Sequence, residues 1–158
     1  MLSKQYLKDY IDALKEIDEI QEKITRLEAE IAKVEERILE IQEGEVVKDL
    51  VYGGEGGQQP FHIEGVPLPE YSERKQMLKI KKALLSQRKA TLEILKIDLV
   101  QKTRDVETFI SSIPDSQMRR IINLRFIQRL SWNAVAMRMG GGNTDETVRQ
   151  AFHRFMNK

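Results

Sequence analysis

The sequence predicts an all-α fold: a long antiparallel helical hairpin, or coiled coil, followed by a small C-terminal helical domain. Three observations lead to this prediction. Two regions carry apolar residues at seven-residue spacing, residues 114–158 contain three short amphipathic segments, and the 158 residues are 32% charged but only 6% aromatic. Long helices have this composition, whereas a thick mixed core needs more aromatic side chains.

The first region, residues 3–43, is predicted to be one helix. It contains no Gly or Pro, and a helix of this length would extend about 60 Å, which is too long to be stable without a partner surface. Five consecutive heptads place apolar residues, many of them β-branched, at the a and d positions of a coiled coil. The a positions are Tyr10, Ile17, Ile24, Ile31 and Ile38, and the d positions are Ala13, Ile20, Leu27, Val34 and Ile41.

The second region, residues 71–112, is predicted to be the partner helix. Its apolar seam is thinner, because the companion positions, three residues after the members of its seven-residue series, include the polar residues Lys81, Arg88 and Lys102. Residues 3–43 hold seven Lys and Arg against twelve Asp and Glu, and residues 71–113 hold ten against five. The opposite net charges, −5 and +5, favour pairing within the chain. A parallel homodimer through the first helix is the alternative. The apolar series is Leu78, Leu85, Leu92, Leu99, Val106 and Ile113, with Leu95 and Phe109 as companions.

Residues 44–70 are predicted to form a short glycine-rich loop or β-hairpin at the tip of the helical pair. A β-prone run, 46–52, precedes the glycine cluster 53–57, and His62 is interpreted as a loop residue. No Lys and Ser or Thr follow the last glycine at the spacing of a phosphate-binding loop. The predicted domains are a helical hairpin over 1–113, made of a helix over 3–43, this loop over 44–70 and a helix over 71–112, and a second domain over 114–158.

Three short helices are predicted in residues 114–158. Pro114 is expected to open the first, and Ser131 to cap the second, which ends at Gly140–Gly142. The third runs to about Met156, and the spacing of Asn143 and Glu146 is that of a capping box. Three short helices with a glycine turn before the last are typical of a helix-turn-helix. Four arginines of the first helix are expected to be available to solvent: Arg119, Arg120, Arg125 and Arg129.

The last helix has one apolar and one polar face, since Val148, Ala151, Phe152 and Phe155 cluster on one side. The polar side chains suit contacts with duplex DNA, because Arg recognises guanine, Gln adenine and Glu cytosine. Residues 114–158 also hold eight Lys and Arg against three Asp and Glu, which favours a polyanionic partner. The predicted DNA-binding residues are Ser131, Thr144, Glu146, Thr147, Arg149, Gln150, His153 and Arg154.

Several segments resemble region 4 of sigma-70-type RNA polymerase sigma factors: Ile113–Pro114, Arg120–Phe126, Leu130–Ala136 and Gly142–Arg149. The whole chain resembles phage-encoded regulators of the ArpU-like late group. The resemblance implies sequence-specific binding of double-stranded DNA near promoters, and it allows contact with RNA polymerase. Two features differ from sigma factors: Gly140 and Gly141 lengthen the turn, and no promoter-melting region is visible.

Other classes of function have weaker support in the sequence. Without Cys, and with only two His about 90 positions apart, no metal site, cofactor or catalytic centre is expected. No apolar run could span a membrane, so a cytoplasmic protein is expected. The alternatives are the small, DNA-recognising subunit of a phage packaging terminase and a coiled-coil adaptor or inhibitor without DNA binding. The coiled coil would also allow a homo-oligomer.

Overall fold

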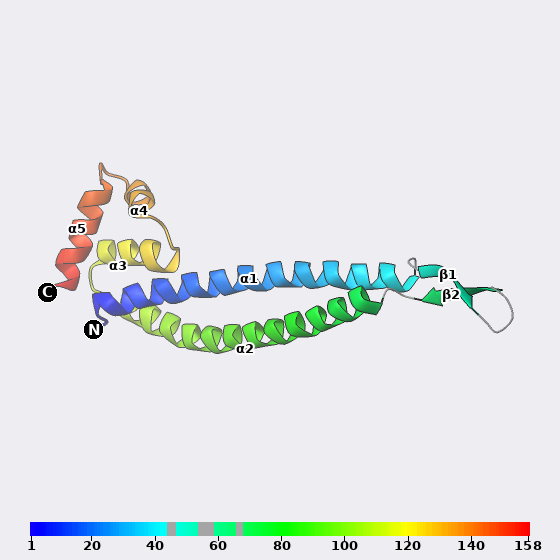
Figure 1. Ribbon diagram of the computed structural model, residues 1–158. Helices are drawn as coiled ribbons and strands as arrows, with labels where there is room; N and C mark the ends of the chain where they lie inside the picture. The colour runs from blue at the N-terminus through cyan, green and yellow to red at the C-terminus, as the bar shows by residue number, and fades with distance from the viewer. Residues whose placement is uncertain (44–46, 54–58, 66–67) are drawn as a thin grey trace. The chain divides into compact units, whose positions relative to one another are not determined.

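The computed structural model describes residues 1–43, 47–53, 59–65 and 68–158. The predominantly helical fold expected from the sequence is confirmed. Figure 1 shows two long helices, two short strands and a group of short C-terminal helices. The elements are α1 (Lys4–Glu43), β1 (Val47–Gly53), β2 (Gln59–Gly65), α2 (Leu68–Ser112), α3 (Ser116–Ile122), the π-helical segment η1 (Asn123–Ile127), α4 (Trp132–Met139) and α5 (Asp145–Met156).

The chain divides into two compact units. The terminal unit contains residues 1–19 and 93–158, and the middle unit contains residues 20–92. Each long helix therefore contributes residues to both units. The domains predicted from the sequence, 1–113 and 114–158, divide the chain by the order of its elements and not by these units, and that division remains a prediction.

In the middle unit, the predicted seam of α1 is buried. Ile24, Leu27, Ile31, Val34, Ile38 and Ile41 all lie below one tenth exposure. The facing residues of α2 are less buried. Among the predicted a and d positions of α2 in this unit, only Leu92 is fully buried, whereas Leu78 and Leu85 are half-buried. The polar companions expected in the sequence account for this difference, since Lys81 and Arg88 occupy positions that an apolar residue would fill.

Ion pairs show that the two segments of the middle unit run antiparallel. Lysine nitrogens of α2 lie 2.6 to 2.8 Å from glutamate oxygens of α1. From the Lys89–Glu28 pair to the Glu70–Arg37 pair, the residue numbers fall on α2 and rise on α1. Exposed pairs such as these contribute about 0–1 kcal/mol each, so their main effect is on register and orientation. The pairs, with the α2 residue first, are Lys89 with Glu28, Lys82 with Glu35, Lys81 with Glu30, and Glu70 with Arg37 at 3.1 Å.

The strands β1 and β2, which lie between α1 and α2 in the sequence, pair antiparallel. The register places Val47 opposite Gly65 and Gly53 opposite Gln59. His62, expected in a loop, instead belongs to β2 and lies opposite Leu50, because the β-prone residues continue past the turn. Most of the glycine cluster predicted as a loop, residues 54–57, lies outside the described residues.

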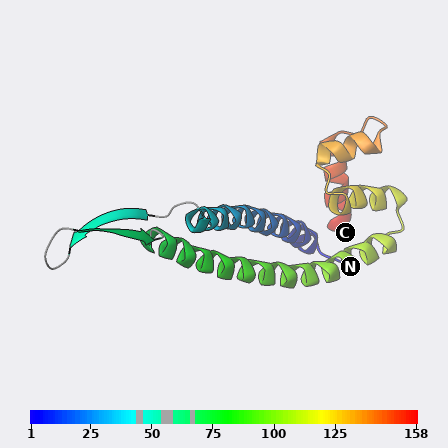
Figure 2. The same ribbon diagram turned by 90° about the vertical axis from the view of Figure 1, so that its right-hand side faces the viewer.

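The terminal unit has a continuous apolar core built from six helical elements. Leu7 and Tyr10 of α1 join Val106, Phe109 and Ile110 of α2 and Ile113, which directly follows α2, and the short helices supply the rest. Both views place α3, α4 and α5 beside the N-terminal end of α1 (Figures 1 and 2). The residues contributed by the short helices are Met118, Ile121, Ile122, Leu124, Phe126, Val135, Ala136, Val148 and Phe152.

The start of α3 differs from the sequence prediction. Asp115 caps the helix, since its side chain accepts a hydrogen bond of 2.9 Å from the backbone N–H of Gln117, and Pro114 lies before the cap. An aspartate side chain can satisfy a free N–H of the first turn, which proline cannot do. Pro114 therefore precedes α3 instead of opening it.

The cap of α5 also lies one residue further on than predicted. Thr144 and Thr147 form the capping box: each backbone N–H donates to the other residue's hydroxyl oxygen, at 2.8 and 3.2 Å. Asn143 donates instead to the carbonyl oxygen of Gly140, at 2.6 Å, and closes the glycine turn. All three glycines have positive φ, between 66° and 76°. Asn143 belongs to the turn that they form, so the cap of α5 falls on the next residue.

Within the described ranges, the helices are all too polar or too short to cross a bilayer.

Candidate nucleic-acid interface

The helix α5 has a buried and an exposed face, as its sequence predicts. Val148 and Phe152 are each only 2% exposed. The ring of Phe152 lies 5.4 Å from the rings of both Phe126 and Trp132, in tilted arrangements that favour aromatic contact. This packing fixes the helix on α4 and η1 and turns its polar residues outward.

Seven of the eight predicted DNA-binding residues are exposed. They come from the cap of α4 and from the cap and outer face of α5, and His153 is the half-buried exception. The exposed residues are Ser131, Thr144, Glu146, Thr147, Arg149, Gln150 and Arg154. Their role in DNA binding remains a prediction.

Three side chains of the outer face of α5 bind one another. Glu146 accepts a hydrogen bond of 2.7 Å from the amide of Gln150, and it also pairs with the guanidinium of Arg149. The hydrogen bond from Gln150, followed by that from Arg149, lowers the pKa of Glu146. The carboxylate is therefore charged at neutral pH and neutralises part of the charge that Arg149 offers to a partner.

Three predicted contact residues have a structural task as well. The Ser131 hydroxyl accepts a hydrogen bond of 3.2 Å from the backbone N–H of Ala134 at the start of α4. Thr144 and Thr147 form the box at the start of α5. These hydroxyls are held in fixed positions by the helix ends, which is how phosphate contacts are commonly positioned at helix N-termini.

The four arginines expected to be available to solvent are engaged within the protein. Arg119 donates to the carbonyl oxygens of Ile113 and Pro114, and Arg120 donates to the carbonyl oxygen of Arg138. These carbonyls lie at or just beyond helix C-terminal ends, where no intrahelical donor remains. Arg120 is exposed, as expected, although it also holds a carbonyl oxygen, whereas Arg119 is half-buried and the expectation is wrong for it.

The other two arginines are held more firmly. Arg125 is half-buried, donates to the carbonyl oxygen of Leu130 at 2.8 Å, and lies over the ring of Trp132 at 5.2 Å. Its Nε is buried with no hydrogen-bond partner in the described part of the chain. Arg129 pairs with Asp18 of α1. The arginines of α3, η1 and the following turn thus bind carbonyl oxygens near helix ends or join elements of the terminal unit.

His153 opens into a groove that sequence reasoning missed. The groove, here called the α1–α5 groove, has a volume of about 670 Å³ and lies within the terminal unit. One side is the first four turns of α1, and the other is aromatic. The only signal in the sequence is the spacing of Lys4, Lys8 and Lys15, and nothing in it relates these residues to α5. The lining residues are Lys4, Gln5, Lys8, Ile11, Asp12, Lys15, Arg125, Phe126, Trp132, Phe152 and His153.

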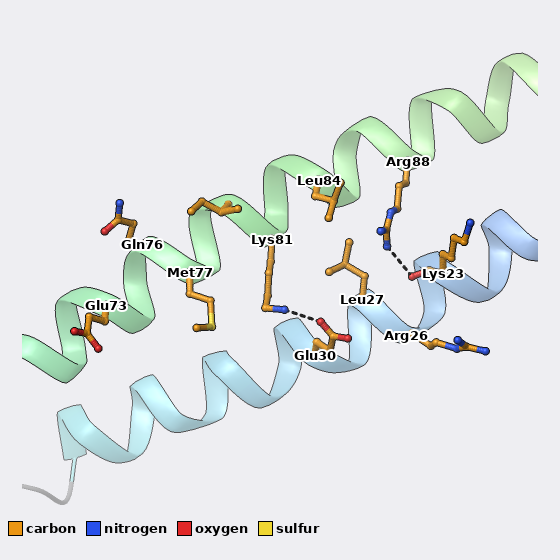
Figure 3. A pocket seen from close by; sticks show the side chains of 11 residues that line it. Lys23, Arg26, Leu27, Glu30, Glu73, Gln76, Met77, Lys81, Leu84 and Arg88 are labelled. Carbon is orange, nitrogen blue, oxygen red and sulfur yellow. Dashed lines mark hydrogen bonds and ion pairs between the residues drawn. The ribbon is translucent and has the colours of Figure 1, made fainter.

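A second hollow, of about 640 Å³, lies between α1 and α2 in the middle unit. Figure 3 shows Leu27 and Leu84 pointing toward each other, with the Lys81–Glu30 ion pair beside them. Arg88 also crosses the hollow and donates to the carbonyl oxygen of Lys23 at 3.3 Å. Its apolar residues on α2, Met77 and Ile80, are 44% and 63% exposed, so this surface is open to a partner.

Among the residues that the structure describes, no three His, Cys, Asp or Glu side chains are grouped closely enough to hold a metal ion.

Searches for relatives found no protein-family model, no curated protein and no solved structure that matches the chain.

Proposed function

We propose that this protein binds double-stranded DNA in a sequence-specific manner through α5, and that it is a phage transcription regulator. In this proposal α4, the glycine turn and α5 act as a helix-turn-helix similar to region 4 of sigma factors. The two long helices form a single antiparallel hairpin that carries it. RNA polymerase is a further partner that the resemblance allows.

The outer face of α5 supports this proposal most directly. Arg149, Gln150 and Arg154 are exposed on a helix whose opposite face is fixed in an aromatic core. The capping box fixes where the helix begins, with its cap at Thr144, two residues after the last of the three left-handed glycines. An α-helix with exposed Arg and Gln fits the major groove, where each bidentate contact discriminates by about 1–3 kcal/mol.

The proposal is tested by duplex binding of an Arg149→Ala, Gln150→Ala variant. Fluorescence anisotropy with duplexes obtained by in-vitro selection should show at least about a tenfold loss of affinity, or 1.4 kcal/mol. The matched control is Gln21→Ala, Arg26→Ala on α1, where Arg26 pairs with a glutamate one turn away as Arg149 does. Unchanged affinity of the α5 variant would exclude this face as the reading surface.

The middle unit is assigned to association with a second copy of the chain. The observation in favour is the exposed apolar surface at Met77 and Ile80 beside the charged residues of the hollow. Sedimentation velocity should show a dimer that dissociates on Met77→Lys, Ile80→Lys substitution. A closed ring of about eight or more subunits would favour the packaging-terminase alternative, and a monomer would contradict the assignment.

A further inference from the structure

The α1–α5 groove contains two lysines, Lys4 and Lys8, that are not engaged in ion pairs with the described residues. Both lysines are exposed. Lys15 differs, because its ammonium lies 3.6 Å from Asp12. Spaced four residues apart, Lys4 and Lys8 lie on one face of α1, on the same side of the groove.

The position of Lys4 works against the stability of its own helix. Lys4 is the first residue of α1, and the first turn contains no acidic residue. A cation at this end meets the positive end of the helix dipole, which is unfavourable by about 0.3–1 kcal/mol at an exposed site. Helix stability therefore gives no reason for this residue, whereas binding of an anion in the groove does.

His153 connects this groove to the outer face of α5. It follows Arg149 and Gln150 by four and three residues and so lies on their side of the helix. It also lines the groove together with Lys4 and Lys8. The surface proposed to read DNA bases is therefore continuous with the lysines at the start of α1.

Five arginines of the C-terminal segment are already engaged within the protein. Arg119, Arg120, Arg125 and Arg129 bind carbonyl oxygens or Asp18, and Arg149 pairs with Glu146. A protein that reads a duplex needs phosphate contacts on both sides of its recognition helix, because these contacts position the helix and supply much of the affinity. In the terminal unit, Lys4 and Lys8 are cations beside α5 with no such engagement.

We infer that Lys4 and Lys8 bind backbone phosphates of the duplex next to the base pairs that α5 contacts. The first two turns of α1 then belong to the DNA interface, although more than one hundred residues separate them from α5 in sequence. Lysine acts here as a flexible point charge, which suits contacts that carry no sequence information. This inference rests on the proposed function and adds a second element to the same surface.

The test is the salt dependence of duplex binding by a Lys4→Gln, Lys8→Gln variant. Loss of two phosphate contacts should reduce the slope of log affinity against log salt by about 1.8, since each contact contributes roughly 0.9. Selected and random duplexes should be weakened by the same factor, because phosphate contacts do not distinguish sequences. The control, Lys33→Gln, Lys79→Gln, removes two exposed lysines of the middle unit and should leave the slope unchanged.

The single tryptophan gives an independent readout of the groove. Trp132 lines it, so its emission should change when a duplex binds to the wild-type protein and to the control. The change should be reduced in the Lys4→Gln, Lys8→Gln variant and restored in Lys4→Arg, Lys8→Arg, which retains both charges. Thermal unfolding should show the Gln variant to be at least as stable as wild type, because it removes an unfavourable dipole interaction.

The outcomes separate the two proposals. If the Arg149→Ala, Gln150→Ala variant loses binding while the lysine variant behaves like its control, α5 reads DNA and the inference about α1 is wrong. If the wild-type protein binds no duplex at low salt, both proposals fail. If an acidic peptide, but no duplex, changes Trp132 emission, the groove is a protein-binding site and the inference is again overturned.

Discussion

The guanidinium of Arg129 lies 2.5 Å from a carboxylate oxygen of Asp18, and it does so from a left-handed backbone conformation with φ 59°. Arg129 lies in the turn that joins η1 to α4, and Asp18 lies in the fifth turn of α1. Left-handed conformation is unfavourable by about 1–2 kcal/mol for a residue with a Cβ atom. The turn therefore retains a strained residue whose side chain joins it to α1.

Substitutions at Arg129 should separate strain from charge. Arg129→Gly relieves the strain and loses an exposed ion pair worth roughly 0.2–1 kcal/mol, so the two effects nearly cancel. Arg129→Ala loses the pair and keeps the strain, and it should be less stable than Arg129→Gly by about 1 kcal/mol. Urea unfolding measures both, and equal stability of the two variants would show that the turn is not strained.

Tyr6 and Asp105 should give the terminal unit an alkaline limit. The Tyr6 hydroxyl donates a 2.6 Å hydrogen bond to Asp105, which together with burial raises the pKa of Tyr6 from 10.0 to about 12. Because the folded pKa exceeds the unfolded one, this stabilisation is complete below about pH 10 and is lost between about pH 10 and 12. Tyr6→Phe should remove that dependence, as measured by thermal unfolding across this range.

The middle unit should lose stability in acid. Hydrogen bonds from Lys81 and Arg37 lower the pKa values of Glu30 and Glu70 below the ordinary 4.5. Both folded pKa values lie below the unfolded ones, so the stabilisation is present above about pH 4.5 and is lost as the pH falls further. Hydrogen exchange of residues 20–43 and 68–92 should accelerate in this range. A Glu30→Gln, Glu70→Gln variant should show a flatter pH dependence, and an equally steep one would contradict this assignment.

Glu146 should restrain DNA binding. Glu146→Ala releases Arg149 and removes a negative charge from the outer face of α5. Affinity for random duplex should rise several-fold at low salt, and the salt slope should steepen by roughly 0.9 as one further phosphate contact forms. Anisotropy titrations at several salt concentrations measure both quantities. Glu22→Ala, which releases Arg26 on α1 in the same way, is the control.

The glycine turn should be sensitive to backbone conformation alone. A Cβ at Gly140 would meet nothing within 4 Å, yet φ there is 68°. Gly140→Ala should therefore destabilise the protein by about 1–2 kcal/mol through left-handed strain. Gly140→Asn should be affected as much, because with ψ at −162° Gly140 lies outside the left-handed helical region that Asn tolerates. Chemical unfolding measures both variants, and a clearly smaller loss for Asn would contradict this explanation.

The helical seam could be predicted from the sequence because it depends on local periodicity. Ile24, Ile31 and Ile38 recur every seven residues, and any partner must bury them. The segment η1 could not be predicted in this way. Leu124 and Phe126 are both buried, although residues two apart do not share a face of a regular α-helix. Both side chains lie in the core of the terminal unit, so the elements around this segment, and not its own periodicity, decide their burial.

The candidate interface was predicted where it depends on one helix and missed where it depends on two. The faces of α5 follow from its own spacing, so the exposure of Arg149 and Gln150 could be read directly. The engagement of Arg119 and Arg125 with distant carbonyl oxygens depends on chain reversals between helices. The α1–α5 groove needs residues from both ends of the sequence, and no pattern within either end indicates the other.

The terminal unit is discontinuous, and this sets an order for folding. Residues 1–19 leave the ribosome long before residues 93–158, with which they share a core. Contacts at such separation form slowly, because a long loop must first be closed. The middle unit shortens that loop, since Ile20 and Thr91 line the same small hollow. We therefore expect the middle unit to form first and the terminal unit, with the proposed DNA-binding helix, to be completed last.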